Sequence, residues 1–425
     1  MKRSALYLGG TLPTRSETFV YREVFGLRDR GWRVAVASVH PPQRDLGEAA
    51  LDALADEAIV AYRPGVVGRA IAEWLRHPLR ASSTLLDGLR LSLFGSDVSL
   101  AGRPKVIWQT LAALGIADEV RRLDVSRIHA HMAHVPTTIA MILARHLGLP
   151  FSFTGHAVDL FRDGSLLREK LRRAAFCACI SEWHRAFYQS IDRLSVDRLP
   201  VIRCGVDIER FAPRGESRRT DGRRQIVAVG RLVPKKGFDL LLDAAPALLE
   251  RHRDLVIRIA GDGPEREALT ARWRSLGAPK NIELLGAATN EDVRRMLRDA
   301  DLFVLPCRID DSGDRDGIPV VLMEAMACGT PVVSGDLPAI RELITDGDTG
   351  LLVPSDDSAA LAAAIERVLT DRALAGRLAA RGRERVVEEF ALEINLRRLT
   401  RAFGEPEELH DTERKPGALA SAAPT

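Results

Sequence analysis

Short apolar runs alternate with longer segments of helical periodicity along most of this chain. Between the first two runs, residues 17–30 place Val20, Val24 and Leu27 on one face of a helix. Because strands that alternate with helices form parallel sheets, the first half predicts a doubly wound α/β domain. Its expected strands are residues 5–8, 34–38, 59–62, 127–131, 151–154, 175–180 and 200–203.

The alternation restarts after a polar segment, residues 214–224, which predicts a linker. Pro246 is expected to kink or break its helix, because proline removes a backbone donor. The second half therefore predicts another doubly wound domain, and ligands of such folds bind at the carboxyl ends of the strands. Its expected strands are 226–230, 255–261, 282–286, 301–306, 331–334 and 350–353, and its main expected helices are 238–251, 358–369 and 373–389.

Two stretches depart from this pattern. Residues 64–122 predict two or three helices, which we interpret as an insertion in the first domain. Residues 404–425 are rich in Glu, Pro, Ala and Ser, a composition typical of a disordered tail. The length of 425 residues is enough for two domains that each bury a full core.

Charge nearly balances over the whole chain, at +3, but it is unevenly distributed. Residues 1–224 hold 34 Lys or Arg and 24 Asp or Glu, a net of +10, whereas the remainder is net −7. A basic first half favours an anionic partner such as a membrane surface, and nucleic acid is disfavoured because no basic stripe is interleaved with aromatic residues. Five scattered cysteines without a C-x-x-C pair predict reduced thiols in a cytoplasmic protein.

The most informative stretch is the segment 316–329, D-G-I-P-V-V-L-M-E-A-M-A-C-G. An apolar run precedes it, Gly317 permits a turn, and Pro319 suits the first position of a helix. The start of such a helix offers free N–H groups and a positive dipole end to an anion. Asp316 lies before the helix and Glu324 within it, eight positions on. This arrangement suits a ligand that is anionic at one place and rich in hydroxyls elsewhere, such as a sugar nucleotide.

The acid-x7-acid segment resembles the donor-site signature of retaining glycosyltransferases of family 4, which have the GT-B fold. The family usually has Glu where this chain has Asp316. The resemblance implies two Rossmann-like domains facing a central cleft: residues 1–213 for the acceptor and 225–390 for the donor, with a helix at 391–403 crossing back. It also implies that Gly317, Ile318, Pro319, Val320 and Glu324 bind the donor.

A second motif of this half, residues 229–237, has the sequence V-G-R-L-V-P-K-K-G. Cations follow a strand end at once, so Arg231 and Lys236 can bind a diphosphate, although a solvated basic turn is the plainer interpretation. The segment resembles the diphosphate motif of family 4, which makes Gly230, Arg231 and Lys236 donor-binding.

Two weaker motifs surround this one. The strand ending in Leu285 and Gly286 resembles one that flanks the nucleotide base in the family. Gly261 and Gly263 are half of a G-x-G-x-x-G, but Arg266 replaces the third glycine, which disfavours a dinucleotide-dependent oxidoreductase.

In the first half, Ser16, Glu17, Thr18 and Phe19 resemble the S-E-T-F element of a polysaccharide-forming branch of family 4. With Gly10, which lets a backbone approach a ligand, they predict a donor-side Glu17 and an acceptor-side Ser16, although Ser16 could simply cap a helix.

Histidines form the other candidate cluster of this half. His156 follows a strand end and resembles a histidine that contacts the transferred sugar. The series His129, His131 and His134 suggests zinc but lacks a fourth ligand, so we expect no metal and place His131 on the acceptor side.

The resemblance implies transfer of a hexose, with retention, from a nucleotide diphosphate sugar, expected to be UDP-linked, to a saccharide acceptor. Arg231 and Lys236 would stabilise charge on the diphosphate, Asp316 would orient the sugar, and Glu324 would bind the ribose. No cofactor is expected, because these cations supply the charge. Two alternatives stay open: a GT-B sugar-nucleotide epimerase and a non-catalytic nucleotide-sugar-binding subunit.

The insertion carries seven Lys or Arg against three acids over residues 62–105, beside leucines and a tryptophan at helical spacing. This pattern is typical of an interfacial helix, although an amphipathic pair covering the sheet would show it too. We therefore expect a cytoplasmic protein at the inner face of the cell membrane, acting on a lipid-linked acceptor for an extracellular polysaccharide.

Overall fold

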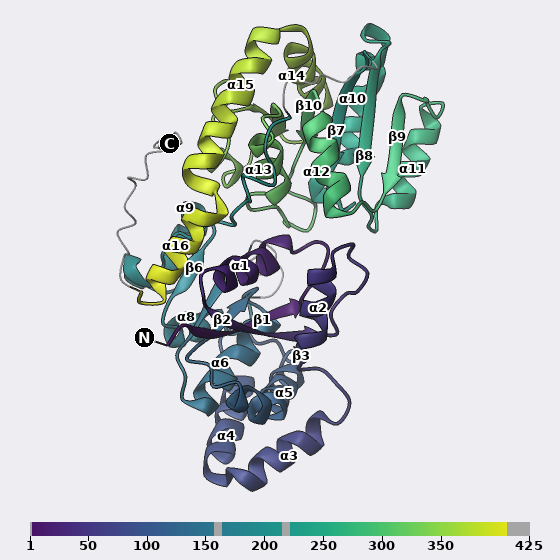
Figure 1. Ribbon diagram of the computed structural model, residues 1–425. Helices are drawn as coiled ribbons and strands as arrows, with labels where there is room; N and C mark the ends of the chain where they lie inside the picture. Colours follow the sequence, from purple (N-terminus) through teal and green to yellow (C-terminus); the bar gives the residue numbers. More distant parts are fainter. Residues whose placement is uncertain (1, 157–163, 215–221, 406–425) are drawn as a thin grey trace, which may run out of the picture.

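The computed structural model describes residues 2–156, 164–214 and 222–405. Two α/β domains lie one above the other in Figure 1, and the last helix of the described chain, α16 (Leu392–Ala402), lies against the first. Each domain has a six-stranded parallel sheet covered by helices, which confirms the predicted fold class.

The first sheet has the order β3-β2-β1-β4-β5-β6, with every pair parallel. Its central strands are buried along most of their length, because helices cover both faces. Tyr7 pairs with Val36 on one side and His129 on the other. The strands are β1 Ser4–Thr11, β2 Arg33–His40, β3 Ile59–Val60, β4 Ile128–His131, β5 Phe151–Gly155 and β6 Cys177–Cys179.

Two buried clusters form the core of this domain, one on each face of the sheet. Residues of α1 and α16 form one cluster with β1 and β2, and residues of α5 and α6 form the main cluster on the other face. Apart from the insertion, the helices that the structure describes in this domain are α1 Thr18–Asp29, α2 Ala49–Glu57, α6 Val135–Leu147, α8 Leu167–Arg173 and α9 Glu182–Ile191.

The predicted insertion is a layer of three helices, α3 Val66–Arg76, α4 Pro78–Phe94 and α5 Arg103–Arg122. It lies at the end of the first domain that is remote from the second (Figure 1). Glu73 of α3 is 1% exposed and accepts from His146 Nε2 of α6 at 2.7 Å and from Arg121 of α5. Because a buried carboxylate requires such partners, this contact fixes α3 on the domain.

The second sheet has the order β12-β11-β10-β7-β8-β9, again all parallel. Its strands are β7 Arg224–Val229, β8 Leu255–Ala260, β9 Ile282–Gly286, β10 Leu302–Leu305, β11 Val332–Gly335 and β12 Leu351–Val353. Its helices are α10 Phe238–Arg251, α11 Arg266–Ser275, α12 Asn290–Asp299, α13 Val320–Ala327, α14 Ser358–Thr370 and α15 Arg372–Arg385.

The last helices return the chain to the first domain. After α15, a π-helical turn at Val386–Phe390 leads into α16, Leu392–Ala402. Leu396 and Leu399 of α16 belong to the buried cluster of the first domain. A Cβ at Gly26 of α1 would lie 2.4 Å from Leu396 Cδ1, so glycine permits this close packing.

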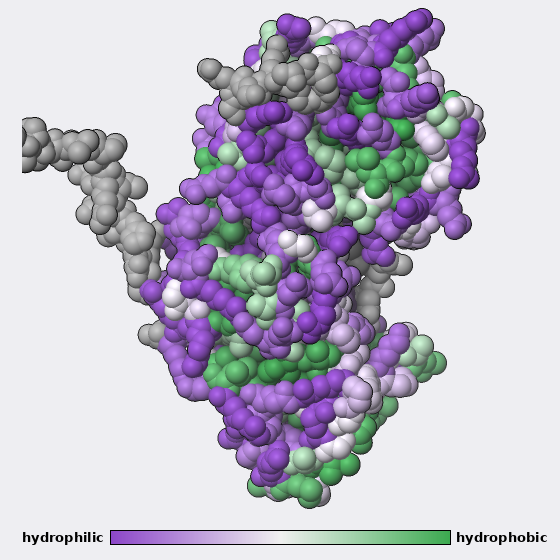
Figure 2. All heavy atoms as spheres, turned by 45° about the vertical axis from the view of Figure 1, so that its right-hand side comes forward, coloured by the Kyte–Doolittle hydropathy of each residue, from purple (hydrophilic) through white to green (hydrophobic). Residues whose placement is uncertain are grey.

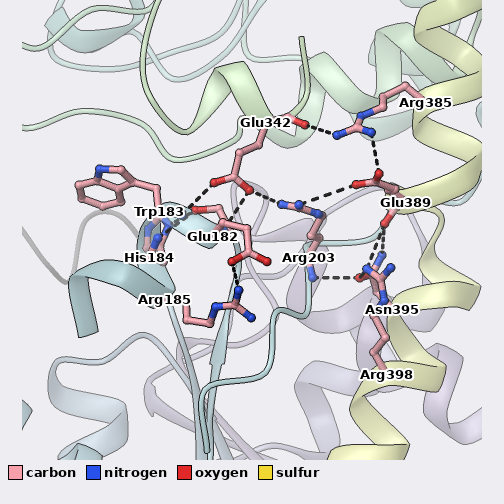
Figure 3. A network of polar contacts seen from close by, with 11 residues as sticks. Glu182, Trp183, His184, Arg185, Arg203, Glu342, Arg385, Glu389, Asn395 and Arg398 are labelled. Atoms are coloured by element: carbon pink, nitrogen blue, oxygen red, sulfur yellow. Dashed lines mark hydrogen bonds and ion pairs between the residues drawn. The ribbon is translucent and has the colours of Figure 1, made fainter. Parts of the chain in front are cut away.

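A polar network joins the domains near α16 (Figure 3). Glu342 of the second domain accepts from the backbone N–H groups of Glu182 and Trp183, each at 2.9 Å, and so caps α9 of the first. Arg203 Nη1 donates to the same carboxylate at 2.7 Å, and its guanidinium lies 4.9 Å from the centre of the Phe390 ring. Burial alone would raise the pKa of Glu342, but Arg203 and the two N–H groups outweigh burial and lower it.

One prediction of local structure was wrong. The expected strand at 200–203 is absent, because within this described segment Val201 forms only an isolated bridge with Cys179. Of the kink or break expected at Pro246, the break is absent: α10 continues through the proline, which lies on the exposed face, with Leu242 and Leu248 buried. Residues 215–221 of the expected linker and 406–425 of the expected tail lie outside the described residues.

Candidate functional site

The acid-x7-acid segment lies at the carboxyl end of the second sheet. Asp316 follows β10 and precedes α13, whose N-cap is Pro319. Lys236 Nζ lies 2.8 Å from Asp316 Oδ2, and Lys235 Nζ lies 3.6 Å from Oδ1. The predicted Asp316 and Lys236 are therefore brought together, and their side chains are only 14% and 13% exposed.

The electrostatics keep this pair charged. Burial would raise the pKa of Asp316, but Lys236 and Lys235 outweigh burial and lower it. Burial would likewise lower the pKa of Lys236, but Asp316 raises it. We call the N-terminal end of α13, together with Asp316 and the two lysines, the mouth of α13. This site presents an ionised carboxylate beside ammonium groups and the N-terminus of a helix.

Lys235 was not identified from the sequence. Its Nζ is 3.1 Å from Asp314 Oδ1, and both side chains are buried. The 3₁₀ turn Pro234–Lys236 aims both lysines at the loop before α13, which the sequence could not distinguish from a solvated turn. Gly237 ends the turn at φ 65°, where a Cβ would lie 2.1 Å from the Pro306 carbonyl oxygen, so only glycine fits.

Arg231 occupies a different environment. It follows Gly230 at the end of β7 and is exposed. Within the described part of the chain its guanidinium has no hydrogen bond or ion pair, unlike the two lysines. It therefore remains available to an anionic ligand.

Beside this strand end lies a cavity of about 310 Å³. Leu232 borders it on one side, and Leu284 and Gly286 of β9 border it on another. Arg266 and Trp273 of α11 complete the wall. Leu285, the neighbouring residue predicted to flank the base, is 46% exposed and does not line the cavity.

Glu324 lies on the inner face of α13 and is 5% exposed. Its Oε1 accepts from Nη1 of Arg22, which comes from α1 of the first domain, at 2.6 Å. No local pattern indicates this contact, because 302 positions separate the two residues. The predicted ribose-binding acid is thus also a contact between the domains.

The predicted histidines converge at the carboxyl end of the first sheet. His131 Nδ1 is 3.2 Å from His156 Nε2, and His131 Nε2 is 3.1 Å from Glu23 Oε1 of α1. The Tyr7 hydroxyl donates to the same Glu23 oxygen at 2.7 Å. Burial would raise the pKa of Glu23, but His131, His129 and Tyr7 outweigh burial and lower it. Burial, followed by the nearby His131, lowers the pKa of His156.

Glu23, His129 and His131 are close enough to hold a metal ion, with their ligand atoms within 4.8 Å of one another. Hydrogen bonds already engage these atoms: His129 contacts Ser152 at 2.8 Å and Thr154 at 3.0 Å. Burial lowers the pKa of His129 to about 3, so it is neutral. These three residues therefore form a buried hydrogen-bonded cluster.

The S-E-T-F element lies at the start of α1. Glu17 is the N-cap residue and forms no side-chain cap, and Ser16 is exposed before it, so the capping role considered for Ser16 is not observed. The Phe19 ring lies 4.5 Å from the His156 ring, which joins this element to the histidine pair. At Gly10, the nearest atom to an added Cβ among the described residues would be Pro136 Cγ, at 4.0 Å.

Comparisons with known proteins agree with this arrangement. Residues 210–385 match the family model of glycosyl transferases group 1. Over 275 residues the chain is 34% identical to the GDP-mannose-dependent alpha-(1-6)-phosphatidylinositol monomannoside mannosyltransferase of Mycolicibacterium smegmatis, covering 61% of this chain and 71% of that protein. This chain belongs to the group 1 glycosyl transferases.

Other relatives of this group 1 glycosyl transferase match most of the chain. The putative colanic acid biosynthesis glycosyltransferase WcaL of Escherichia coli is 29% identical over 416 residues, covering 91% of this chain and 96% of that protein. The structure of Anabaena HepE in complex with UDP and glucose superimposes with a TM-score of 0.70 at 16% identity, covering 95% and 99% of the two chains. At that identity the likeness concerns the fold alone, and it agrees with the GT-B arrangement of the two domains.

Proposed function

We propose that this glycosyltransferase moves a hexose, with retention of anomeric configuration, from a nucleotide diphosphate sugar to a lipid-linked saccharide in extracellular polysaccharide biosynthesis. The observation that carries the proposal is the cluster at the mouth of α13. There Asp316 lies 2.8 Å from Lys236, with the helix N-terminus beside it. Such a cluster can bind both a diphosphate and the hydroxyls of a sugar.

The chemistry follows from the charges. As the bond between the sugar and the phosphate breaks, negative charge grows on the diphosphate, and Lys236 and Arg231 stabilise it. Asp316 accepts hydrogen bonds from sugar hydroxyls and orients the anomeric carbon. The leaving phosphate takes the proton of the acceptor hydroxyl on the same face, so retention needs no nucleophile on the far face. These cations supply the positive charge that a metal provides elsewhere.

The cavity beside β9 is the place that we propose for the nucleotide base. It is bordered by Leu232, the residue after Arg231, and its walls are partly apolar, which suits the flat ring of a nucleotide base. We expect uridine, and the M. smegmatis relative, which is described as GDP-mannose-dependent, makes guanosine the base to test against it. Titration with UDP and with GDP distinguishes the two.

The helical insertion is the surface that we propose for the membrane. Hydrophobic residues gather at its end of the molecule (Figure 2), including Leu79 at 88% exposed and Phe94 at 79%. Arg76, Arg80 and Arg90 are exposed around them. An apolar face edged with cations fits an anionic lipid surface. No helix among the described residues is long and apolar enough to cross a bilayer.

The test is to incubate the protein with UDP- and GDP-linked hexoses and lipid-linked saccharide acceptors, and to record proton NMR spectra of the first product. The proposal predicts a product that depends on the acceptor and keeps the donor's anomeric configuration. An inverted anomer would refute the retaining mechanism. A new sugar nucleotide formed without any acceptor would indicate the epimerase alternative, and binding without turnover would indicate the non-catalytic one.

A further inference from the structure

Arg22 is inserted from the first domain into the second. Its Nη1 lies 2.6 Å from Glu324 Oε1, and the two side chains are only 8% and 7% exposed. The guanidinium also lies 5.1 Å from the centre of the Phe211 ring, which belongs to the core of the second domain. Arg22 therefore reaches the wall of the donor site although it belongs to the opposite domain.

Neighbouring contacts fix the position of α1. The hydroxyl of Tyr21, the residue before Arg22, accepts from Asn290 Nδ2 at the start of α12, at 2.7 Å. Glu48 of the first domain pairs with Arg210 at 2.8 Å and lies 3.4 Å from the same Asn290 nitrogen. The guanidinium is thus held within a polar interface, and its position does not depend on a flexible side chain alone.

The pair leaves Glu324 able to bind something else. A carboxylate has about four lone-pair sites, and Arg22 uses one of them, on Oε1. Within the described residues, no hydrogen bond reaches Oε2. A buried carboxylate requires a hydrogen-bonding or charged partner, and Arg22 supplies one on Oε1. Arg22 therefore holds Glu324 in place and leaves Oε2 as an acceptor on the inner face of α13.

We propose that Arg22 is a positioning residue for the donor, which holds Glu324 as the acceptor for the ribose hydroxyls. This inference rests on the proposed function, because that function assigns the ribose to Glu324. It adds a role for the other domain: the acid that recognises the ribose is complete only when α1 lies against α13. A guanidinium suits this role because it stays charged when it is buried.

The test measures recognition of the hydroxyls themselves. UDP and GDP are titrated calorimetrically against their 2′,3′-dideoxy forms, which lack both ribose hydroxyls. The wild-type protein should bind the complete nucleotide about 10- to 150-fold more tightly, as expected for hydrogen bonds to a charged group. Arg22→Met should reduce this ratio to within about threefold, and Arg22→Lys should restore part of it.

Two controls separate positioning from folding. Arg30→Met removes another contact between α1 and a carboxylate, that of Glu393 on α16, and should leave the ratio unchanged. Arg22→Met leaves Glu324 without its cation, so Arg22→Met combined with Glu324→Gln should recover thermal stability. That double variant should show the same ratio as Glu324→Gln alone.

The outcomes separate this inference from the function on which it rests. If wild-type protein binds neither UDP nor GDP, the proposed function fails and the inference with it. The wild-type protein could bind the complete nucleotide more tightly than its dideoxy form, and Arg22→Met could keep that affinity ratio while binding both ligands equally more weakly. Arg22 would then only hold the domains together. In that case the positioning role is refuted and the proposed function stands.

Discussion

Replacing Lys236 with methionine tests how the mouth of α13 holds the diphosphate. The side chain keeps most of its length and loses its charge. In the protein, its Nζ lies 2.8 Å from Asp316 Oδ2, and both groups are largely buried. The substitution therefore removes a cation from the donor and from Asp316 at the same time.

The expected loss of affinity follows from this geometry. A charge-assisted hydrogen bond removed from a shielded site costs about 1.5–3 kcal/mol, or about 10- to 150-fold in Kd. Lys235 Nζ, 3.6 Å from the other oxygen of Asp316, compensates part of the charge. We therefore expect the lower half of that range, about 10- to 50-fold for UDP or GDP. We also expect some loss of stability, because Asp316 keeps only the more distant cation.

Calorimetric titration and thermal unfolding check both parts. Arg231→Ala should weaken nucleotide binding comparably without lowering the melting temperature, since Arg231 is exposed and makes no ion pair among the described residues. Lys280→Met, at an exposed lysine of the same domain, should change neither quantity. Unchanged affinity of Lys236→Met for both nucleotides would refute the assignment of the diphosphate to this site.

Three further predictions concern Asp316, the need for a metal and the junction between the domains. Asp316→Ala should mainly lower kcat and Asp316→Glu should be tolerated, whereas wild-type kinetics of the alanine variant would exclude an orienting role. Turnover should persist in EDTA, and its loss, reversed by added metal, would show that a metal is needed. Acidification should weaken the junction between the domains at Glu342. Because the pKa of Glu342 is lowered in the folded protein, its contribution to the free energy of unfolding is complete at neutral pH and disappears as the pH falls through the folded-state pKa. Glu342→Gln should flatten this part of the pH dependence of unfolding, and identical profiles for the variant and the wild-type protein would contradict a stabilising role of the ionised Glu342.

Regular elements with strong local signals were predictable from the sequence. The helix at 238–251 has the predicted bounds, and β9 has them too. Their apolar periods and flanking glycines suffice to mark them. The predicted strand at 200–203 had the same apolar appearance, yet only Val201 finds a partner. A short apolar segment forms a strand only where the edge strand of a sheet can hydrogen-bond with it along its whole length. The local sequence does not show whether such an edge is present.

The candidate site was predictable in part, for the same physical reason. Asp316 and Lys236 were found because each lies in a motif at a strand end. Arg22 and Glu23 were missed, since both lie within an ordinary amphipathic helix and their partners are far away in sequence. The pairing of His131 with His156 had an available signal: both follow or end adjacent parallel strands, so their side chains meet at one edge of the sheet.

A crystal structure with UDP or GDP bound tests the proposed donor site most directly. We predict that the diphosphate contacts Arg231, Lys236 and the N-terminus of α13, with the ribose hydroxyls on Glu324 and the base in the cavity beside β9. The proposed site would be contradicted if the nucleotide were bound elsewhere. Lys236 would then keep its contact with Asp316 and Glu324 its contact with Arg22, with no ligand near either side chain.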